Sequence, residues 1–90
     1  MKKKQYIFIS VNGNRTYKNS LSLKEMQKFV GGYIEKVGNI YCNEDGISLN
    51  LKRNNIYPEF YGNIIIEQWL NFNKGDFYEI IFIRSSIKKF

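Results

Sequence analysis

The chain has 90 residues, which is enough for one domain and too few for two. Its apolar fraction of 43% and aromatic fraction of 17% can supply a core, which excludes an intrinsically disordered chain. The net charge of +6 favours nucleic acid or an acidic protein as partner, and no run approaches the roughly 18 apolar residues that a membrane span needs. We expect one domain over residues 1–90, with basic residues 1–4 and 88–90 as flexible ends.

The composition also limits the chemistry of the chain. It contains no histidine, which removes the usual general base and the commonest metal ligand. The one cysteine, Cys42, cannot form an intramolecular disulfide and has no histidine to activate it, so we expect a packed thiol in a cytoplasmic protein. No glycine-rich phosphate-binding motif is present. We therefore expect a protein that is not an enzyme and that needs no metal or other cofactor.

The N-terminal third predicts a strand, a turn and a second arm. Residues 5–11, QYIFISV, are β-branched and aromatic on both faces, as in a central strand. Asn12-Gly13 follows and indicates a type I′ turn, because this pair accepts positive φ angles. Residues 15–19, RTYKN, then fit either the short second strand of a hairpin or the lead into the helix.

The clearest helix signal begins at Ser22. Ser22 and Glu25 fit a capping box, and Leu21 and Met26 occupy the two positions of a hydrophobic staple. The pair Gly31-Gly32 then ends the apolar stripe, and a glycine at this place indicates a left-handed helix stop. An alternative is that this bare backbone faces a ligand, so both glycines are also candidate site residues.

The segments after the helix predict further strands. Residues 33–37 and 40–42 flank a turn at Gly38-Asn39, and residues 43–46, NEDG, form a second turn signal. Residues 47–51, ISLNL, alternate and predict a half-buried strand with Ile47, Leu49 and Leu51 inward.

The C-terminal part predicts an irregular segment and a hairpin. Residues 52–63 lack a period, and one helical turn fits around Pro58 to Tyr61. Residues 64–72 and 77–84 flank a turn, and Glu67 is expected to point outward and protect its strand from edge pairing. The expected fold is α+β, with one helix packed on a mainly antiparallel sheet of about five to six strands.

The irregular segment is the main candidate site, because it combines basic, aromatic and amide side chains. These groups suit single-stranded nucleic acid, where aromatic rings stack on bases. They equally suit a protein contact, where Tyr and Arg are favoured anchors. A third reading is structural, with the aromatics covering the core and the charges in solvent. The candidate residues are Lys52, Arg53, Asn54, Asn55, Tyr57, Phe60 and Tyr61.

Three segments resemble a small domain-of-unknown-function family of bacteriophages and mobile elements. They are LSLKEMQKFVGGYIEKV, NEDGISLNLKRN and YGNIIIE, within residues 21–67, and the V-G-G-Y-I-E signature spans Val30–Glu35. Where the family often carries a proline pair, near residues 52–54, this chain has KRN. The resemblance brings no catalytic residues, and it implies a phage-type protein that acts by binding in the host cytoplasm.

The expected function is stoichiometric binding, or masking, of a protein partner of the host, as an inhibitor would act. The expected surface is the 52–63 segment and a neighbouring sheet edge, where a homodimer could also form by strand addition. Two alternatives stay open. One is a basic nucleic-acid-binding module, and the other is sequestration of a nucleotide or small anionic ligand by a dimer.

Overall fold

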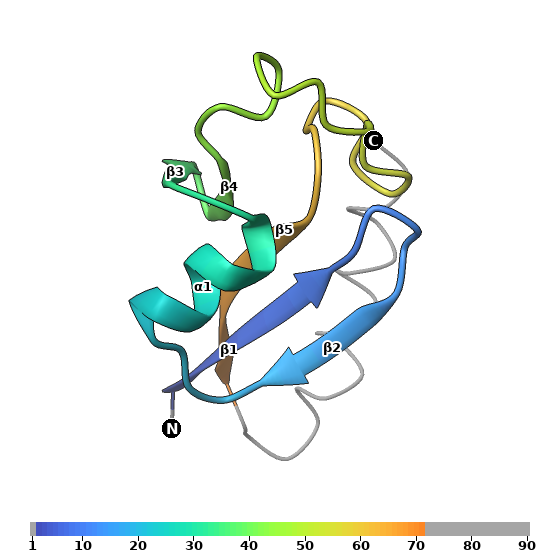
Figure 1. Cartoon of the computed structure of the whole chain (residues 1–90). Helices are drawn as coiled ribbons and strands as arrows, with labels where there is room; N and C mark the ends of the chain where they lie inside the picture. The colour runs from blue at the N-terminus through green and yellow to red at the C-terminus, as the bar shows by residue number, and fades with distance from the viewer. Residues whose placement is uncertain (1, 72–90) are drawn as a thin grey trace.

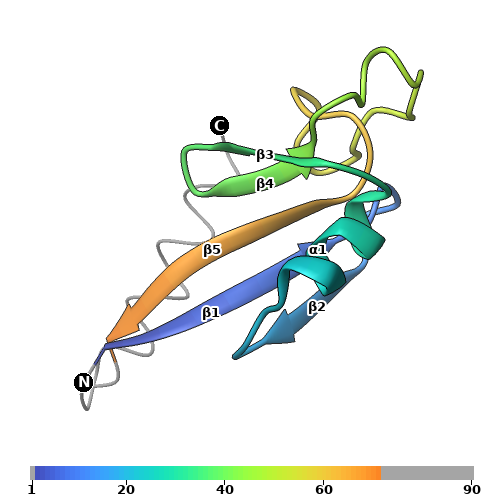
Figure 2. The same ribbon diagram turned by 60° about the vertical axis from the view of Figure 1, so that its left-hand side comes forward.

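The computed structural model describes residues 2–71 of the chain as one helix on a five-stranded antiparallel sheet. The strands are β1 (Lys2–Ile9), β2 (Arg15–Lys18), β3 (Ile34–Val37), β4 (Ile40–Asn43) and β5 (Ile64–Asn71), and the helix is α1 (Leu23–Val30). The strand order is β2-β1-β5-β4-β3, and α1 lies across one face (Figures 1 and 2). The predicted α+β class is confirmed. Residues 73–84, predicted as the C-terminal turn and second hairpin arm, lie outside the described residues, as do residues 88–90.

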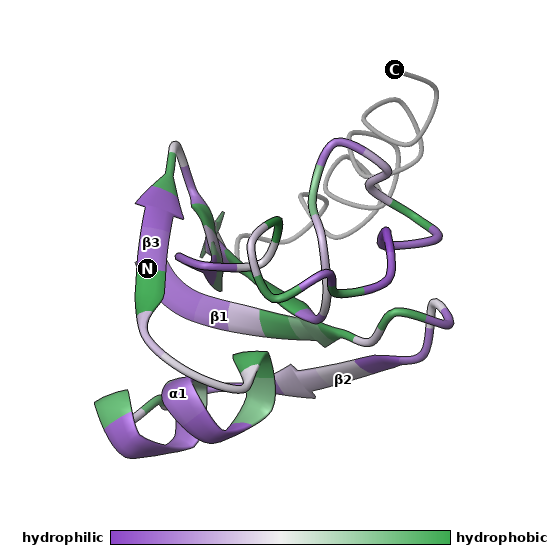
Figure 3. Cartoon of the chain, turned by 45° about the horizontal axis from the view of Figure 1, so that its top comes forward, coloured by the Kyte–Doolittle hydropathy of each residue, from purple (hydrophilic) through white to green (hydrophobic). Residues whose placement is uncertain are grey.

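The centre of the sheet is the long antiparallel pair of β1 and β5. Ile7, Ile9 and Ile64 are buried near one end of this pair, as the apolar run at residues 5–11 predicts. At the other end β1 is polar, and its Lys3 and Lys4 pair with the apolar Leu70 and Trp69 of β5. Figure 3 shows this change in hydropathy along β1. The structure thus places Lys2, Lys3 and Lys4 within a strand, where flexible ends were expected.

The turn between β1 and β2 differs from the predicted type I′ form. The N–H of Gly13 donates to the carbonyl of Ser10, and the N–H of Ser10 donates to the carbonyl of Asn14. Gly13 has a φ of 92°, whereas Asn12 does not have a positive φ. This is the three-residue hairpin loop in which a type I turn is followed by a left-handed residue. The prediction of a hairpin is confirmed. The predicted type I′ turn is wrong, because it requires a positive φ at both Asn12 and Gly13, and only Gly13 has one.

The helix begins as predicted. The hydroxyl of Ser22 accepts a 3.1 Å hydrogen bond from the N–H of Glu25, and Leu21 and Met26 pack against the same core cluster. The carboxylate of Glu25, expected to reach back to the Ser22 amide, instead accepts from the Nζ of Lys18 on β2. The first turn of α1 is therefore tied both to its own cap and to the edge strand.

The Gly31-Gly32 pair ends α1 by a local and a tertiary mechanism. Gly31 has a φ of 84°, and the N–H groups of both glycines donate to the carbonyl of Gln27. The side-chain amide of Asn43 donates to the carbonyl of Val30 at 3.0 Å. A Cβ at Gly32 would lie 3.3 Å from that amide nitrogen, so the glycine lets β4 approach the helix end closely.

Residues 47–51 do not form the predicted strand. The N–H of Leu49 donates to the carbonyl of Asp45, and the N–H of Leu51 donates to the carbonyl of Gly46. Ile47 is 75% exposed and Leu49 is 56% exposed, so their alternation does not mark a buried face. Local turn hydrogen bonds satisfy this backbone, while β4 already has a strand on each side.

Residues 52–62 fold back on themselves in place of a helical turn. Arg53 and Tyr61 form an antiparallel bridge, and the N–H of Gly62 donates to the carbonyl of Lys52. A single turn closes at the other end, where the N–H of Phe60 donates to the carbonyl of Tyr57, with Pro58 between them. The predicted helical turn around Pro58 is thus wrong.

The two faces of the sheet have separate hydrophobic clusters. On the helix face, Val30 and Phe29 of α1 pack with Phe8 and Ile65, and the rings of Phe8 and Phe29 lie 4.9 Å apart. The opposite face is covered in part by the 52–62 segment. Its buried members are Ile7, Ile9, Cys42, Ile64 and Ile66, against which Ile40, Ile56, Tyr57 and Phe60 pack.

Glu67 lies on a central strand, which corrects its expected role in edge protection. β5 pairs with β1 on one side and β4 on the other. The carboxylate accepts hydrogen bonds from Lys36 Nζ (3.0 Å) and Tyr41 Oη (3.1 Å) and forms an ion pair with Lys4 Nζ (3.2 Å). Burial raises the pKa of Glu67, but the bonds from Lys36, Lys4 and Tyr41 together outweigh it and leave the pKa lowered.

Candidate functional site

The predicted site residues of the 52–63 segment do not form one surface. Asn54 is 1% exposed, and its amide donates to the carbonyls of Ser10 and Gly62. Its side-chain oxygen accepts from the N–H groups of Ile56 and Tyr57 at 3.0 Å each. Asn54 is therefore the internal brace of the segment, and it has no group left for a partner.

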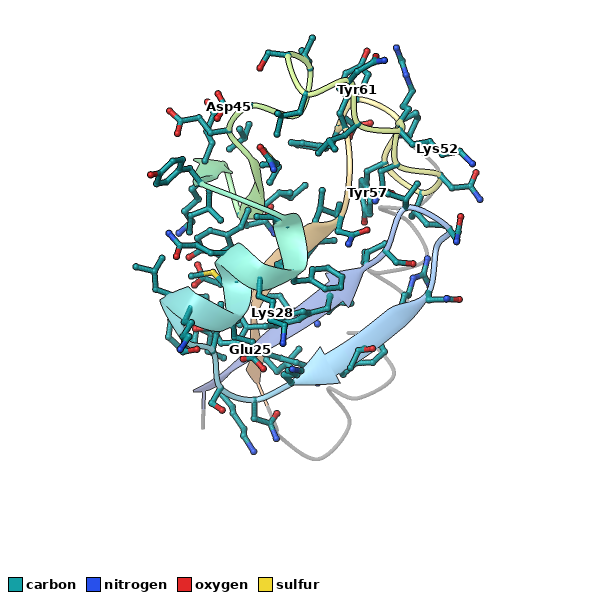
Figure 4. The ribbon with its side chains drawn as sticks, in the orientation of Figure 1. Glu25, Lys28, Asp45, Lys52, Tyr57 and Tyr61 are labelled. Atoms are coloured by element: carbon teal, nitrogen blue, oxygen red, sulfur yellow. The ribbon has the colours of Figure 1, made fainter. Side chains whose placement is uncertain are left out.

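The remaining candidate site residues lie in three different places, namely two clefts and the core. Lys52, Arg53 and Asn55 are exposed and line a polar cleft of about 390 Å³ next to the β1–β2 turn, which we call the Lys52 cleft. Phe60 and Tyr61 line a different cleft. Tyr57 packs against the core, where burial raises its pKa. In Figure 4, Asp45, which precedes this segment, and Lys52 lie on opposite sides of Tyr61.

The second cleft is the larger, with a volume of about 630 Å³, and we call it the β3–β4 cleft. It lies between the face of the β3–β4 hairpin that is turned away from α1 and the segments that follow β4 and precede β5. Its apolar lining comes from Val37, Cys42, Ile47 and Phe60. Its other described lining residues are Glu35, Asn43, Glu44, Gly46, Ser48, Glu59 and Tyr61.

The β3–β4 cleft has an acidic rim on a basic protein. Glu35, Glu44 and Glu59 line it, and all three are exposed, whereas none of its described lining residues is basic. Three of the eight acidic side chains of the chain therefore line one cleft. This rim was not predicted from the sequence. The sequence signal that could have predicted it is the Gly38-Asn39 turn. This turn pairs Glu35 with Cys42, and Glu44, two residues after Cys42, then lies diagonally across from Glu35 on the same face.

Cys42 lies in the wall of the same cleft. It is buried, and its Sγ lies 3.7 Å from the carbonyl oxygen of Glu35 as a weak donor. Burial raises the pKa of the Cys42 thiol, and the negative charge of Glu35 raises it further. The thiol is thus held in its protonated form, in agreement with the expected packed role.

The outer side of β3 carries backbone groups that no described strand pairs. β3 is the last strand of the sheet and bonds to β4 on one side. The N–H of Glu44 donates to the carbonyl of Tyr33. Because hydrogen-bonded pairs alternate along an antiparallel ladder, Tyr33, Glu35 and Val37 direct their backbone groups towards β4. The N–H and C=O groups of Ile34 and Lys36 therefore point away from β4. A strand edge of this kind is a template for a further strand.

The two glycines proposed as ligand backbone lie at the end of α1, just before β3, and line neither of these two clefts. Gly31 is exposed, and Gly32 is half-buried against Asn43. Within residues 2–71, no group of three or more acidic, cysteine or histidine side chains is placed to hold a metal ion. No helix in this part of the chain has the length and apolar character needed to cross a membrane.

Comparison with protein-family models adds one finding to this geometry. A family model described as a domain of unknown function, DUF3846, matches residues 3–80. The chain belongs to the DUF3846 family. The matched region spans all five strands and α1, and it extends well beyond the 21–67 region that carried the resemblance. The clefts of this DUF3846 domain therefore lie within the family region.

Comparisons with curated proteins and with solved structures gave no match. The family description assigns no activity to DUF3846, so the function of this domain is argued from its own surface.

Proposed function

We propose that this DUF3846 domain is a non-catalytic binding protein that acts by stoichiometric binding of a protein partner. The observation that carries the proposal is the β3–β4 cleft, which opens beside an edge strand. Ile47 at the cleft is 75% exposed and Val37 is 47% exposed, although both are large and apolar. Exposed apolar side chains gathered at one concave place are typical of interaction sites.

The contact surface in this proposal is the β3–β4 cleft, whereas the sequence predicted the whole 52–63 segment. Phe60 and Tyr61 stay in it, together with the neighbouring edge β3, while Asn54 serves the fold. Masking of a host protein by a phage-type protein is the finer form of this proposal. It rests on the resemblance at Val30–Glu35, and fold or family likeness alone does not establish it.

Site-specific photo-crosslinking tests this function. A photoreactive amino acid at Ile47 is expected to crosslink a protein in the cells that naturally express the chain, whereas the same group at exposed Lys24 on α1 is not. The captured protein, identified by mass spectrometry and prepared pure, should then titrate the domain to a fixed molar ratio. Equal crosslinking from both positions, or none from Ile47, would contradict the proposal.

A second candidate, nucleic-acid binding, is favoured by the Lys52 cleft. Lys52 and Arg53 are exposed there, and the Arg53 guanidinium lies 5.0 Å from the centre of the Tyr61 ring, to whose hydroxyl it donates at 2.7 Å. A guanidinium held in this way offers charge and a stacking surface to a nucleotide. Fluorescence anisotropy with labelled single strands at rising salt is the test. Binding that falls steeply with salt and is lost in Arg53→Ala would favour this candidate over the first.

A further inference from the structure

We infer that the β3–β4 cleft takes an extended peptide segment of its protein partner, which pairs with the outer edge of β3 and carries a basic and an apolar residue two positions apart. The inference rests on the proposed function and names the chemistry of the bound segment. It is carried by three observations: the unpaired edge, the direction of the side chains along it, and the acidic rim.

The edge provides the backbone contacts. Ile34 and Lys36 direct their N–H and C=O groups away from β4, so an added strand can bond to both residues. Among the described residues, no strand pairs with this side of β3.

The side chains of β3 determine which face of an added strand meets the cleft. Ile34 and Lys36 lie on the helix face, where Ile34 packs in the core cluster and Lys36 bonds to Glu67. Glu35 and Val37 lie on the other face and line the cleft. Alternate side chains of an added strand point to the same face, so residues two apart in the partner lie over Glu35 and Val37.

The rim determines the chemistry of those two residues. One position lies beside Glu35, in a cleft that Glu44 and Glu59 also line, with no basic residue among the described lining residues to neutralise these carboxylates. A Lys or Arg side chain complements this charge. The other position lies beside Val37, which is 47% exposed and whose apolar surface an aliphatic or aromatic side chain would cover.

The test is selection of linear peptides from a random displayed library on the immobilised full chain. We expect enriched sequences with Lys or Arg and a large apolar residue at positions i and i+2. Affinity of a synthetic consensus peptide should weaken about tenfold in the triple variant Glu35→Gln, Glu44→Gln, Glu59→Gln. Asp45→Asn removes an exposed charge next to the rim and should leave the affinity within about twofold.

A matched pair of variants tests the edge. Lys36→Pro removes the outward N–H and should weaken the peptide about tenfold, whereas Lys36→Ala removes the same side chain, keeps the N–H and should bind normally. If Lys36→Pro does not fold, amide hydrogen exchange of the natural chain gives the answer. Peptide binding should slow exchange at Ile34 and Lys36.

Three outcomes would overturn the inference: no enriched peptide, an enriched pattern without the basic residue, or bound peptide with unchanged exchange at Ile34 and Lys36. A concentration-dependent dimer in sedimentation that Lys36→Pro abolishes, in the absence of peptide selection, would assign the edge to a second copy. Crosslinking from Ile47 without peptide binding would leave the proposed function standing and remove only the basic-strand partner. Absence of both the Ile47 crosslink and peptide binding would contradict the proposed function as well as this inference.

Discussion

The side-chain amide of Asn43 donates a 3.0 Å hydrogen bond to the carbonyl of Val30, the last residue of α1. The oxygen of the same side chain accepts from the N–H of Asp45 at 2.8 Å and so shapes the turn that leaves β4. One buried asparagine therefore connects the helix end, the sheet and the first segment of the β3–β4 cleft. Asn63 acts similarly, since it donates to the carbonyl of Phe29 and accepts from the N–H of Val11.

Replacement of Asn43 by Ala should destabilise the fold. It leaves the buried Val30 carbonyl without its side-chain donor and removes the acceptor for Asp45, and an unsatisfied buried polar group costs about 1–3 kcal/mol. Urea unfolding followed by circular dichroism would measure the loss. The exposed Asn19, changed to Ala, is the control and should shift the free energy of unfolding by less than about 0.5 kcal/mol. Equal effects at both positions would contradict the capping role.

Asn54 and Asn55 are neighbours with opposite environments, and they should differ in the same measurement. Asn54→Ala removes four hydrogen bonds from a side chain that is 1% exposed and should cost about 2–4 kcal/mol. Asn55→Ala changes an exposed side chain and should be nearly neutral. A stable Asn54→Ala variant would show that the 52–62 segment holds its shape without this brace.

The left-handed helix stop gives a third prediction. Gly31→Ala places a Cβ at a φ of 84° and should lower the free energy of unfolding by about 1–2 kcal/mol. Gly31→Asn should cost less, because asparagine tolerates this conformation better than alanine. If alanine proves as stable as asparagine, backbone strain does not control this position.

Stability should depend on pH through Glu67. Its folded pKa lies below the unfolded value, so its contribution is present above the unfolded pKa of about 4.3 and is lost as pH falls through the folded pKa. The difference in urea midpoint between the natural chain and Glu67→Gln should therefore shrink as the pH is lowered from 7 towards 3. The pKa of Lys36 is raised by its bonds to Glu67 and Tyr41. The contribution of Lys36 to stability is therefore lost only as pH rises through its folded pKa, above 10.5. A midpoint difference that is constant with pH would contradict the lowered Glu67 pKa.

Cys42 should report on the β3–β4 cleft through its reactivity. Burial and the charge of Glu35 raise its pKa, so alkylation by iodoacetamide at pH 8 should be much slower in the folded chain than in concentrated urea. Glu35→Gln removes the second cause and should speed the folded reaction modestly, while Lys28→Gln on α1 should not. Mass spectrometry over time gives the rates. Fast alkylation of the folded chain would show that the cleft wall opens.

Much of the fold could be predicted because its signals are local. Ser22 caps the start of the helix through its hydroxyl, and Gly31 ends it through a left-handed backbone. The Gly38-Asn39 turn joins β3 and β4 where it was expected. The long apolar runs likewise predicted β1 and β5, whose side chains need burial on both faces.

The candidate site was predicted only in part, because its composition is spread along the chain. Residues 52–61 carry the right side chains, but Asn54 turns inward and Phe60 and Lys52 line different clefts. The alternation at residues 47–51 misled in the same way. A period of two requires a neighbouring strand before it marks a buried face, and the sheet offers none there.

The sequence by itself determined the α+β class and the elements that carry their own start and stop signals. Tertiary structure decided which strand became the edge, which carboxylates met at the β3–β4 cleft, and that Glu67 became the partner of two lysines. The physical reason is the range of the interactions. Caps and turns are satisfied within a few residues, whereas strand order and a shared cleft depend on contacts between residues far apart in the chain.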